Sequence, residues 1–180
     1  RASAVAANIT KAADCEAMVA AARERFGAID IVVNNVGIGG GGDGPAHKLI
    51  EEAFDRILAV NLKGAWQVSK AVLPTLRERG GGSIVNISSL ASIAGGGQTA
   101  YEVSKAALNR LTTSIAQANA GKGVRCNAVA MGLLDTPMAV AGIAQASGQD
   151  QQAVREARNA RVPLGGKMGA AWDTAYAALF

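Results

Sequence analysis

The feature that most constrains the fold of this chain is a regular alternation of short apolar runs with longer segments of helical periodicity. Apolar runs of strand length occupy residues 28–33, 83–87 and 124–130, and segments with helical spacing lie between them. Strands that alternate with helices form parallel sheets through right-handed crossover connections. The pattern therefore predicts an α/β fold with a doubly wound parallel sheet in three layers. The continuous apolar run at residues 28–33 is typical of a strand covered on both faces.

The helical segments can be bounded from their breaker residues. Gly27 is placed to end a helix over residues 14–26. Helical periodicity continues over residues 49–60 and 62–79, and Pro74 should kink or divide the second of these. Further expected elements are a short strand ending at residues 5–9, a long helix over residues 101–120, a weakly helical region at 137–163 and a last helix from Ala170 to Phe180.

Tyr101 and Lys105 form the most chemically suggestive pair in the chain. They are four residues apart in the opening turn of the predicted long helix, so their side chains share one face. A nearby ammonium favours the phenolate form of a tyrosine. A tyrosine in this setting can donate or accept a proton near neutral pH. The spacing is common by chance, and a plain surface pair is the alternative.

Other polar residues follow the predicted strands at their carboxyl ends. Asn34 and Asn35 follow the first strand, Ser88 and Ser89 the second, and Leu134 to Thr136 the third. In open parallel sheets, ligands bind beyond the carboxyl ends of the strands. The sequence therefore predicts that these segments converge with Tyr101 on one site.

These pieces, in this order, resemble the short-chain dehydrogenase/reductase family. The residues that carry the resemblance are Val33-Asn-Asn-Val-Gly37, Asn61 in Val60-Asn-Leu-Lys-Gly64, Gly82-Ser-Ile-Val-Asn-Ile-Ser-Ser89 and Tyr101-Glu-Val-Ser-Lys105. The resemblance implies a Rossmann-type fold. It also implies that residues 1–180 are a single dinucleotide-binding domain, incomplete at both ends, with residues 135–163 as a lid over the substrate.

The resemblance also implies a role for each matching residue. Tyr101 would be the general acid/base, and Lys105 would assist it and hydrogen-bond the nicotinamide ribose. Ser89 would donate to the substrate oxygen, with Ser88 as the alternative because the spacing to Tyr101 is about one residue short. Asn61 would hold a water that links Lys105 to solvent. An asparagine inside a helix is unfavourable, which predicts a kink at this position.

The implied cofactor is NAD or NADP, with the preference unread. The residues implied to bind it, besides Tyr101 and Lys105, are Asn8, Ile9, Asn34, Leu134 and Thr136. The run Gly37-Ile-Gly39-Gly-Gly-Gly42 matches a dinucleotide fingerprint in letters, but no helix opens directly after it, so no helix N-terminus is available for a pyrophosphate. We expect a flexible loop at the mouth of the site instead, with the family's phosphate-binding turn preceding Arg1.

Composition excludes several other classes. The net charge is only +4 and no basic run is present, so nucleic-acid binding has little support. Cys15 and Cys126 lack metal-ligand spacing and His47 is the single histidine, which argues against a zinc site and leaves no metal ligand set. Buried free thiols and the absence of a long apolar run favour a cytoplasmic protein without a membrane span.

The sequence thus predicts an oxidoreductase that interconverts a secondary alcohol and a ketone, acting on a small molecule. The alternative is a protein of the same fold with a non-redox role, as a dehydratase, an epimerase or a regulatory nucleotide binder. The predicted helix 101–120 is apolar around more than half of its circumference. We therefore expect a homodimer or homotetramer, paired through helices 62–79 and 101–120.

Overall fold

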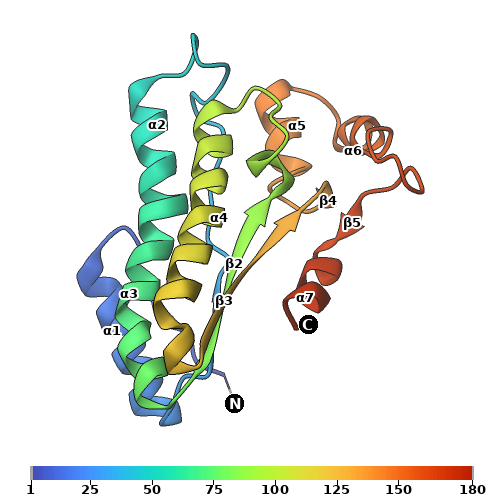
Figure 1. Cartoon of the computed structure of the whole chain (residues 1–180). Coiled ribbons are helices and arrows are strands. Elements are labelled where there is room, and N and C mark those ends of the chain that lie inside the picture. The colour runs from blue at the N-terminus through green and yellow to red at the C-terminus, as the bar shows by residue number, and fades with distance from the viewer. Residues whose placement is uncertain (1, 180) are drawn as a thin grey trace. The chain divides into compact units, whose positions relative to one another are not determined.

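The computed structural model describes residues 2–179, and the chain divides into two compact units, Arg1–Ala130 and Met131–Phe180. The first unit alternates helices and strands as expected (Figure 1). Its elements are α1 (Ala12–Phe26), β1 (Ile31–Asn34), α2 (Glu51–Leu58), a π-helix (Ala59–Gly64), α3 (Ala65–Glu78), β2 (Gly82–Ser89), a short 3₁₀ turn (Leu90–Ser92), α4 (Thr99–Asn119), a second 3₁₀ turn (Ala120–Lys122) and β3 (Val124–Met131).

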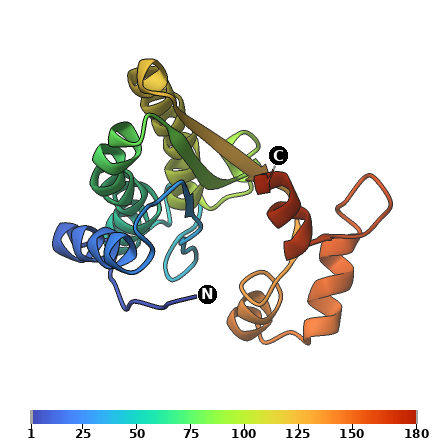
Figure 2. The same ribbon diagram turned by 90° about the horizontal axis from the view of Figure 1, so that it is seen from below.

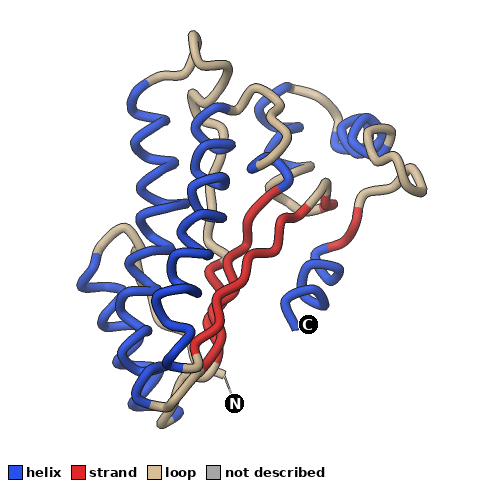
Figure 3. The backbone as a smooth tube through the Cα atoms, in the orientation of Figure 1, coloured by secondary structure: helices blue, strands red, loops and turns tan. Residues whose placement is uncertain are grey.

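The three strands of the first unit form one sheet in the order β1-β2-β3 (Figure 3). Strands β1 and β2 are parallel, and their register pairs Ile31 with Ser83 and Asn34 with Asn86. The connections from β1 to β2 and from β2 to β3 each contain a long helical segment, as parallel neighbours require. The predicted crossover units are thus confirmed.

Within this unit the helices lie on one side of the sheet (Figure 2). Helices α3 and α4 pack against β2, and α1 packs against α3. The opposite face carries Ile31 and Val33, which are 63% and 50% exposed. The prediction that this strand is covered on both faces is therefore not met inside the unit, because no helix of the unit covers that second face.

The core of the first unit lies between the sheet and helices α3 and α4. It is built from apolar side chains that recur every three or four residues on the helices and every second residue on the strands. The buried cluster consists of Val72, Leu76, Ile84, Ile115, Val124 and Cys126.

The prediction that Pro74 could divide the helical segment is wrong, since α3 runs through it. Pro74 and Lys70, four residues earlier, are both exposed, so water can solvate the Lys70 carbonyl, which has no N–H partner at Pro74. The irregularity occurs earlier, in the π-helix around Asn61. The buried apolar side chains of α3 that follow this π-helix include Val68, Val72 and Leu76, whereas Trp66 is 43% exposed.

Two predicted strands in the first 34 residues also differ from expectation. Residues 5–9 form no strand, because none of the described residues supplies a neighbouring strand to pair with them. The strand predicted at residues 28–33 begins only at Ile31. The end of α1 is as predicted: Gly27 adopts a φ of 80° and its N–H donates to the carbonyl of Arg23.

The second unit is small and mostly helical. It contains β4 (Leu134–Asp135), α5 (Ala141–Ser147), α6 (Gln151–Asn159), β5 (Gly169–Ala170) and α7 (Ala171–Leu179). Strands β4 and β5 form a short parallel pair that the sequence pattern did not reveal. Residues 135–163, the expected lid, fall within this unit and contain its two short helices α5 and α6. The core of the unit is formed by Val140, Ala144, Val154 and Met168.

Candidate active site

Asn61 connects three segments of the candidate site. Its Oδ1 accepts from the N–H of Ile38 at 2.8 Å, and its Nδ2 donates to the carbonyl of Ile38 at 2.9 Å. The same Nδ2 donates to Oγ of Ser104 at 3.0 Å. Asn61 is 1% exposed and lies in the π-helix, which confirms the expected irregularity at this residue. Its amide therefore ties the segment after β1 to the first turns of α4.

Lys105 reaches from α4 to the end of β2. Its Nζ donates to the carbonyl of Ile87 at 2.8 Å and lies 5.7 Å from the centre of the Tyr101 ring. The side chain is buried, and this desolvation lowers the pKa of Lys105 from its ordinary value of 10.5 to about 8. The predicted shared face of Tyr101 and Lys105 is thus present, and the amine titrates close to neutral pH.

The two serines at the end of β2 have different surroundings. Ser88 is fully buried, and its hydroxyl donates to the carbonyl of Lys105 at 3.4 Å. Ser89 is only partly buried, and its Oγ accepts from the N–H of Ala91 at 3.1 Å. Because an accepting hydroxyl retains its proton, Ser89 can still donate to a ligand.

Two glycines leave room around these side chains. A Cβ placed on Gly37 would lie 3.4 Å from Nζ of Lys105 and 3.5 Å from Oδ1 of Asn61, and one on Gly39 would lie 3.5 Å from the Tyr101 ring. A larger side chain at either position would occupy the space beside Lys105, Asn61 and Tyr101. The sequence pattern predicted only a loop at these glycines. Their position directly after a predicted strand could have indicated that they border the site.

The glycine-rich segment continues as a loop until α2 begins at Glu51, so the absence of a helix directly after it is confirmed. The expected flexible loop is in fact held by hydrogen bonds along its length. Asn61 holds Ile38, and Nη2 of Arg56 donates to the carbonyls of Gly40 and Gly41 at 3.2 and 2.8 Å. Gly40, Gly41 and Gly42 all have positive φ values, which explains the glycine run.

Asn34 takes part in a chain of buried polar groups beneath the sheet. Its Nδ2 donates to Oδ1 of Asn86 at 2.8 Å and to Oγ of Ser69 at 3.3 Å. Asn86 in turn donates to Oγ1 of Thr112 at 2.8 Å. The chain joins β1, β2, α3 and α4, and so fixes the strand ends from which the site residues project.

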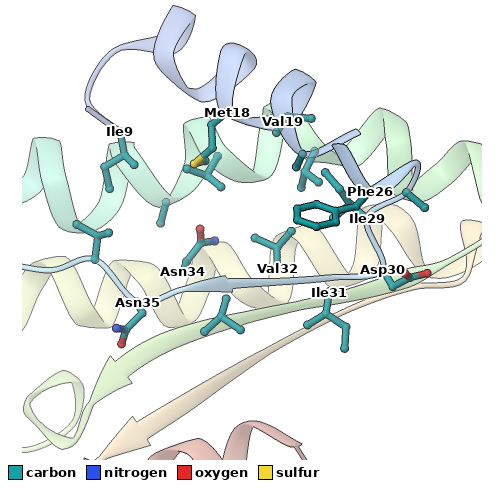
Figure 4. Close-up of a pocket in the computed structure, with 17 residues that line it drawn as sticks. Ile9, Met18, Val19, Phe26, Ile29, Asp30, Ile31, Val32, Asn34 and Asn35 are labelled. Atoms are coloured by element: carbon teal, nitrogen blue, oxygen red, sulfur yellow. The ribbon is translucent and has the colours of Figure 1, made fainter. Parts of the chain in front are cut away.

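A cavity of about 590 Å³ lies along the outer edge of β1, between that strand and α1 (Figure 4). Val32 and Asn34 point toward α1, whereas Ile31 points the other way. Ile9 and Asn34, two of the expected cofactor residues, both line this cavity, and Tyr101 and Lys105 do not. The cavity is therefore distinct from the space around Tyr101 and Lys105.

The remaining expected cofactor residues are placed as follows. The Oδ1 of Asn8 accepts from the N–H and the hydroxyl of Thr10, at 3.0 and 2.8 Å, so this amide is engaged locally. Leu134 and Thr136 belong to the second unit, and their roles stay predictions.

Sequence reasoning missed Ser104, which lies between Tyr101 and Lys105 and donates to the carbonyl of Tyr101 at 2.7 Å.

The described residues include no ionised thiol and no cluster of metal ligands. Cys15 and Cys126 are free and buried, as predicted, and burial raises the pKa of Cys126 to about 11 and also raises that of Cys15. Both thiols therefore stay protonated at neutral pH. Residues 2–179 contain no group of three or more His, Cys, Asp or Glu side chains that could hold a metal ion. None of their helices is long and apolar enough to cross a membrane.

Residues 1–180 match a family model described as enoyl-(acyl carrier protein) reductase. With this match, and with the fold and motifs above, the chain belongs to the short-chain dehydrogenase/reductase family, and its parallel sheet with helices is the Rossmann-type α/β fold of that family. It is 42% identical over 178 residues to 2-(R)-hydroxypropyl-CoM dehydrogenase of Xanthobacter autotrophicus, covering 98% of this chain and 68% of that protein. It spans 62% to 66% of the length of other curated relatives.

Solved structures agree with this assignment. The chain superposes on levodione reductase with a TM-score of 0.91 at 32% identity, and on NAD⁺-bound xylitol dehydrogenase with a TM-score of 0.88 at 26% identity. In each case 98% of this chain is covered, with 68% and 70% of the respective structure.

Proposed function

We propose that this chain forms the catalytic part of an NAD(P)(H)-dependent oxidoreductase that interconverts a secondary alcohol and a ketone. The observation that carries the proposal is the convergence of four side chains from three separate segments. Asn61 donates to Ser104, which in turn donates to the carbonyl of Tyr101. Lys105 lies one turn after Tyr101 and donates to Ile87 on β2, the strand that ends at Ser89. The relatives described above are named as dehydrogenases and reductases, which supports the same reaction class.

Tyr101 acts as the general acid/base in this proposal. In the reducing direction its hydroxyl gives a proton to the carbonyl oxygen, and in the oxidising direction the phenolate takes the alcohol proton. Ser89 donates a hydrogen bond to the same oxygen. Its partial exposure supports it over the fully buried Ser88, whose hydroxyl is turned toward the α4 backbone.

Lys105 supports Tyr101 and contributes to nucleotide binding. An ammonium carries three N–H donors. One of them is used by the carbonyl of Ile87, which fixes the direction of the side chain. The others can donate to ribose hydroxyls. The positive charge favours the phenolate form of Tyr101 while a proton is transferred.

A nicotinamide cofactor suits the residues present. It supplies or accepts the hydride when bound. The backbone at Gly37 lies beside Lys105 and Asn61 with no side chain in the way, and a Cβ there would fill the space between them. Asn34 and Ile9 line the neighbouring cavity and remain our candidates for the adenosine side, together with Asn8. Thr136 remains the candidate for the carboxamide or pyrophosphate side, and Leu134 remains a candidate for cofactor contact.

We also infer that the complete protein is a cytoplasmic homo-oligomer, a dimer or tetramer paired through residues 62–79 and 101–120. Trp66 and Val103, on these two helical segments, are 43% and 45% exposed. Exposed large apolar side chains on long helices favour a second copy as their cover. Light scattering of the complete protein at low micromolar concentration tests this inference, and the mass of one chain would contradict it.

The test of the reaction itself is a cofactor-coupled assay. The absorbance of the reduced nicotinamide is followed with the complete protein, NAD(H) or NADP(H), and a panel of secondary alcohols and ketones. Turnover with any member of the panel supports the proposal and gives the cofactor preference. Tight nucleotide binding without turnover across the panel would contradict it and favour a non-redox role.

A further inference from the structure

Helix α4, which carries Tyr101, begins without a cap from its own sequence. The N–H groups in the first turn of a helix have no partners inside the helix, and a nearby Ser, Thr, Asp or Asn commonly accepts from them. Gln98 occupies the cap position here, and its side chain makes no capping hydrogen bond. The acceptors for this turn must come from elsewhere.

They come from the glycine-rich segment that follows β1. Oδ1 of Asp43 accepts from the N–H of Ala100 at 3.0 Å, and Oδ2 of Asp43 accepts from the N–H of Tyr101 at 3.0 Å. The carbonyl of Gly44 accepts from the N–H of Thr99 at 3.1 Å. Asp43 therefore caps the N-terminus of α4, although it lies 58 residues before Tyr101 in the sequence.

The segment that carries Asp43 is itself well held. Asn61 binds both backbone groups of Ile38, and Arg56 binds the carbonyls of Gly40 and Gly41. The segment also approaches Tyr101 directly, because a Cβ on Gly39 would lie 3.5 Å from the ring. These hydrogen bonds restrain the backbone just before Asp43, and so help to hold its carboxylate at the start of α4.

A second carboxylate in the same turn has a different role. Oε1 of Glu102 accepts from the N–H groups of Gly96 at 2.6 Å and Gln98 at 2.9 Å. These bonds hold the pKa of Glu102 below its ordinary value. Both donors precede the helix. Glu102 therefore fixes the loop that enters α4, whereas Asp43 fixes the backbone of Tyr101.

We propose that Asp43 is a positioning residue for Tyr101, holding the first turn of α4 so that the phenol keeps its place relative to the substrate oxygen. The proposal rests on the proposed function, in which Tyr101 is the acid/base. Without the carboxylate, the amides of Ala100 and Tyr101 lose their acceptors and the turn can fray. A displacement of a catalytic group by about 1 Å can cost about 100-fold in rate.

The test compares Asp43→Ala with Asp43→Asn in the complete protein. A matched control is Asp173→Ala, which removes a carboxylate that accepts from a backbone N–H, that of Ala170, at the start of α7. Amide hydrogen exchange is measured at Ala100 and Tyr101, together with kcat, the KM of the nucleotide and the melting temperature. Asp43→Ser replaces Asp43→Ala in the same measurements if the alanine variant does not fold.

Asp43→Ala should speed exchange at Tyr101 and lower kcat by about tenfold to 100-fold, with a much smaller change in the KM of the nucleotide. Asp43→Asn keeps one oxygen acceptor and places an amide NH2, which cannot accept, where the other oxygen stood. Its kcat should therefore lie between those of the wild type and of Asp43→Ala. Asp173→Ala should lower the melting temperature without lowering kcat.

The proposal is overturned if exchange at Tyr101 is unchanged in the alanine or serine variant. It is also overturned if exchange rises but kcat does not fall, or if Asp173→Ala lowers kcat as much. A wild-type protein without turnover refutes the proposed function instead, and exchange at Tyr101 alone then decides whether Asp43 holds this turn.

Discussion

The Nζ of Lys105 lies 5.7 Å from the centre of the Tyr101 ring and is directed by its hydrogen bond to the end of β2. The pair therefore depends on the sheet as well as on the helix that carries both residues. Since the amine is buried and the phenol is only partly so, the two groups differ in how they respond to mutation and pH.

Tyr101→Phe should lower kcat by at least about 100-fold, because general acid–base catalysis contributes about that much or more and only the oxygen is lost. Nucleotide affinity should stay close to wild type, as measured by fluorescence titration. Tyr176→Phe, on α7 in the second unit, is the matched control and should keep full activity. A Tyr101→Phe variant that retains more than about a tenth of the wild-type rate would show that another group transfers the proton.

Lys105→Met should raise the KM of the nucleotide and move the pH–rate profile, because the variant loses both the ribose donor and the charge beside Tyr101. Steady-state kinetics over a range of pH measures both effects. Lys70→Met, on the exposed side of α3, serves as the control. An unchanged profile and an unchanged KM would refute the dual role of Lys105.

The buried amine should also make stability depend on pH. The pKa of Lys105 is lowered from 10.5 to about 8, so the folded state binds its proton less tightly than the unfolded state. The penalty for burying the charge is fully present below pH 8 and is relieved as pH rises toward 10.5. It amounts to about 3 kcal/mol, since each pKa unit is worth about 1.4 kcal/mol.

Urea unfolding of the protein without nucleotide measures this effect. We expect the contribution of Lys105 to the free energy of unfolding to increase with pH across that window, and Lys105→Met to flatten the dependence. An identical pH dependence in wild type and variant would show that Lys105 is not desolvated in the folded protein.

Asn61→Leu should destabilise the first unit by about 2–4 kcal/mol, because the partly buried N–H and carbonyl of Ile38 and the buried hydroxyl of Ser104 lose their partner. Denaturant unfolding measures the change. Asn127→Leu on β3 is the control, since Asn127 is exposed and its replacement should change stability by less than about 0.5 kcal/mol. Equal effects of the two substitutions would argue against the role of Asn61 in joining the segment after β1 to α4.

The 180 residues expressed alone should fold poorly and be inactive. Ile31 and Val33 are largely exposed, and β1 is an edge strand of its sheet with an apolar cavity along its outer side. Such an edge is prone to association. Calorimetry and light scattering test this expectation. A cooperative melting transition of a monodisperse sample with micromolar nucleotide affinity would contradict it.

Local patterns determined which elements form and roughly where the site lies. Apolar runs and glycine breaks placed α1, β2, α4 and β3, because these signals depend on residues close together in sequence. The spacing of Tyr101 and Lys105 set their shared helical face for the same reason. The asparagine at position 61 signalled an irregular helix, although not that the irregularity would be a π-helix.

Only the tertiary structure decided which partners these residues meet. The cap on the turn of Tyr101 comes from Asp43, and the acceptor for Lys105 is the carbonyl of Ile87 on β2. Neither contact can be predicted from neighbouring residues in the sequence, because each joins segments that only the packing of α4 brings together. For the same reason, the exposure of one face of β1 depends on where the helices of the unit pack, which the apolar run of this strand does not encode.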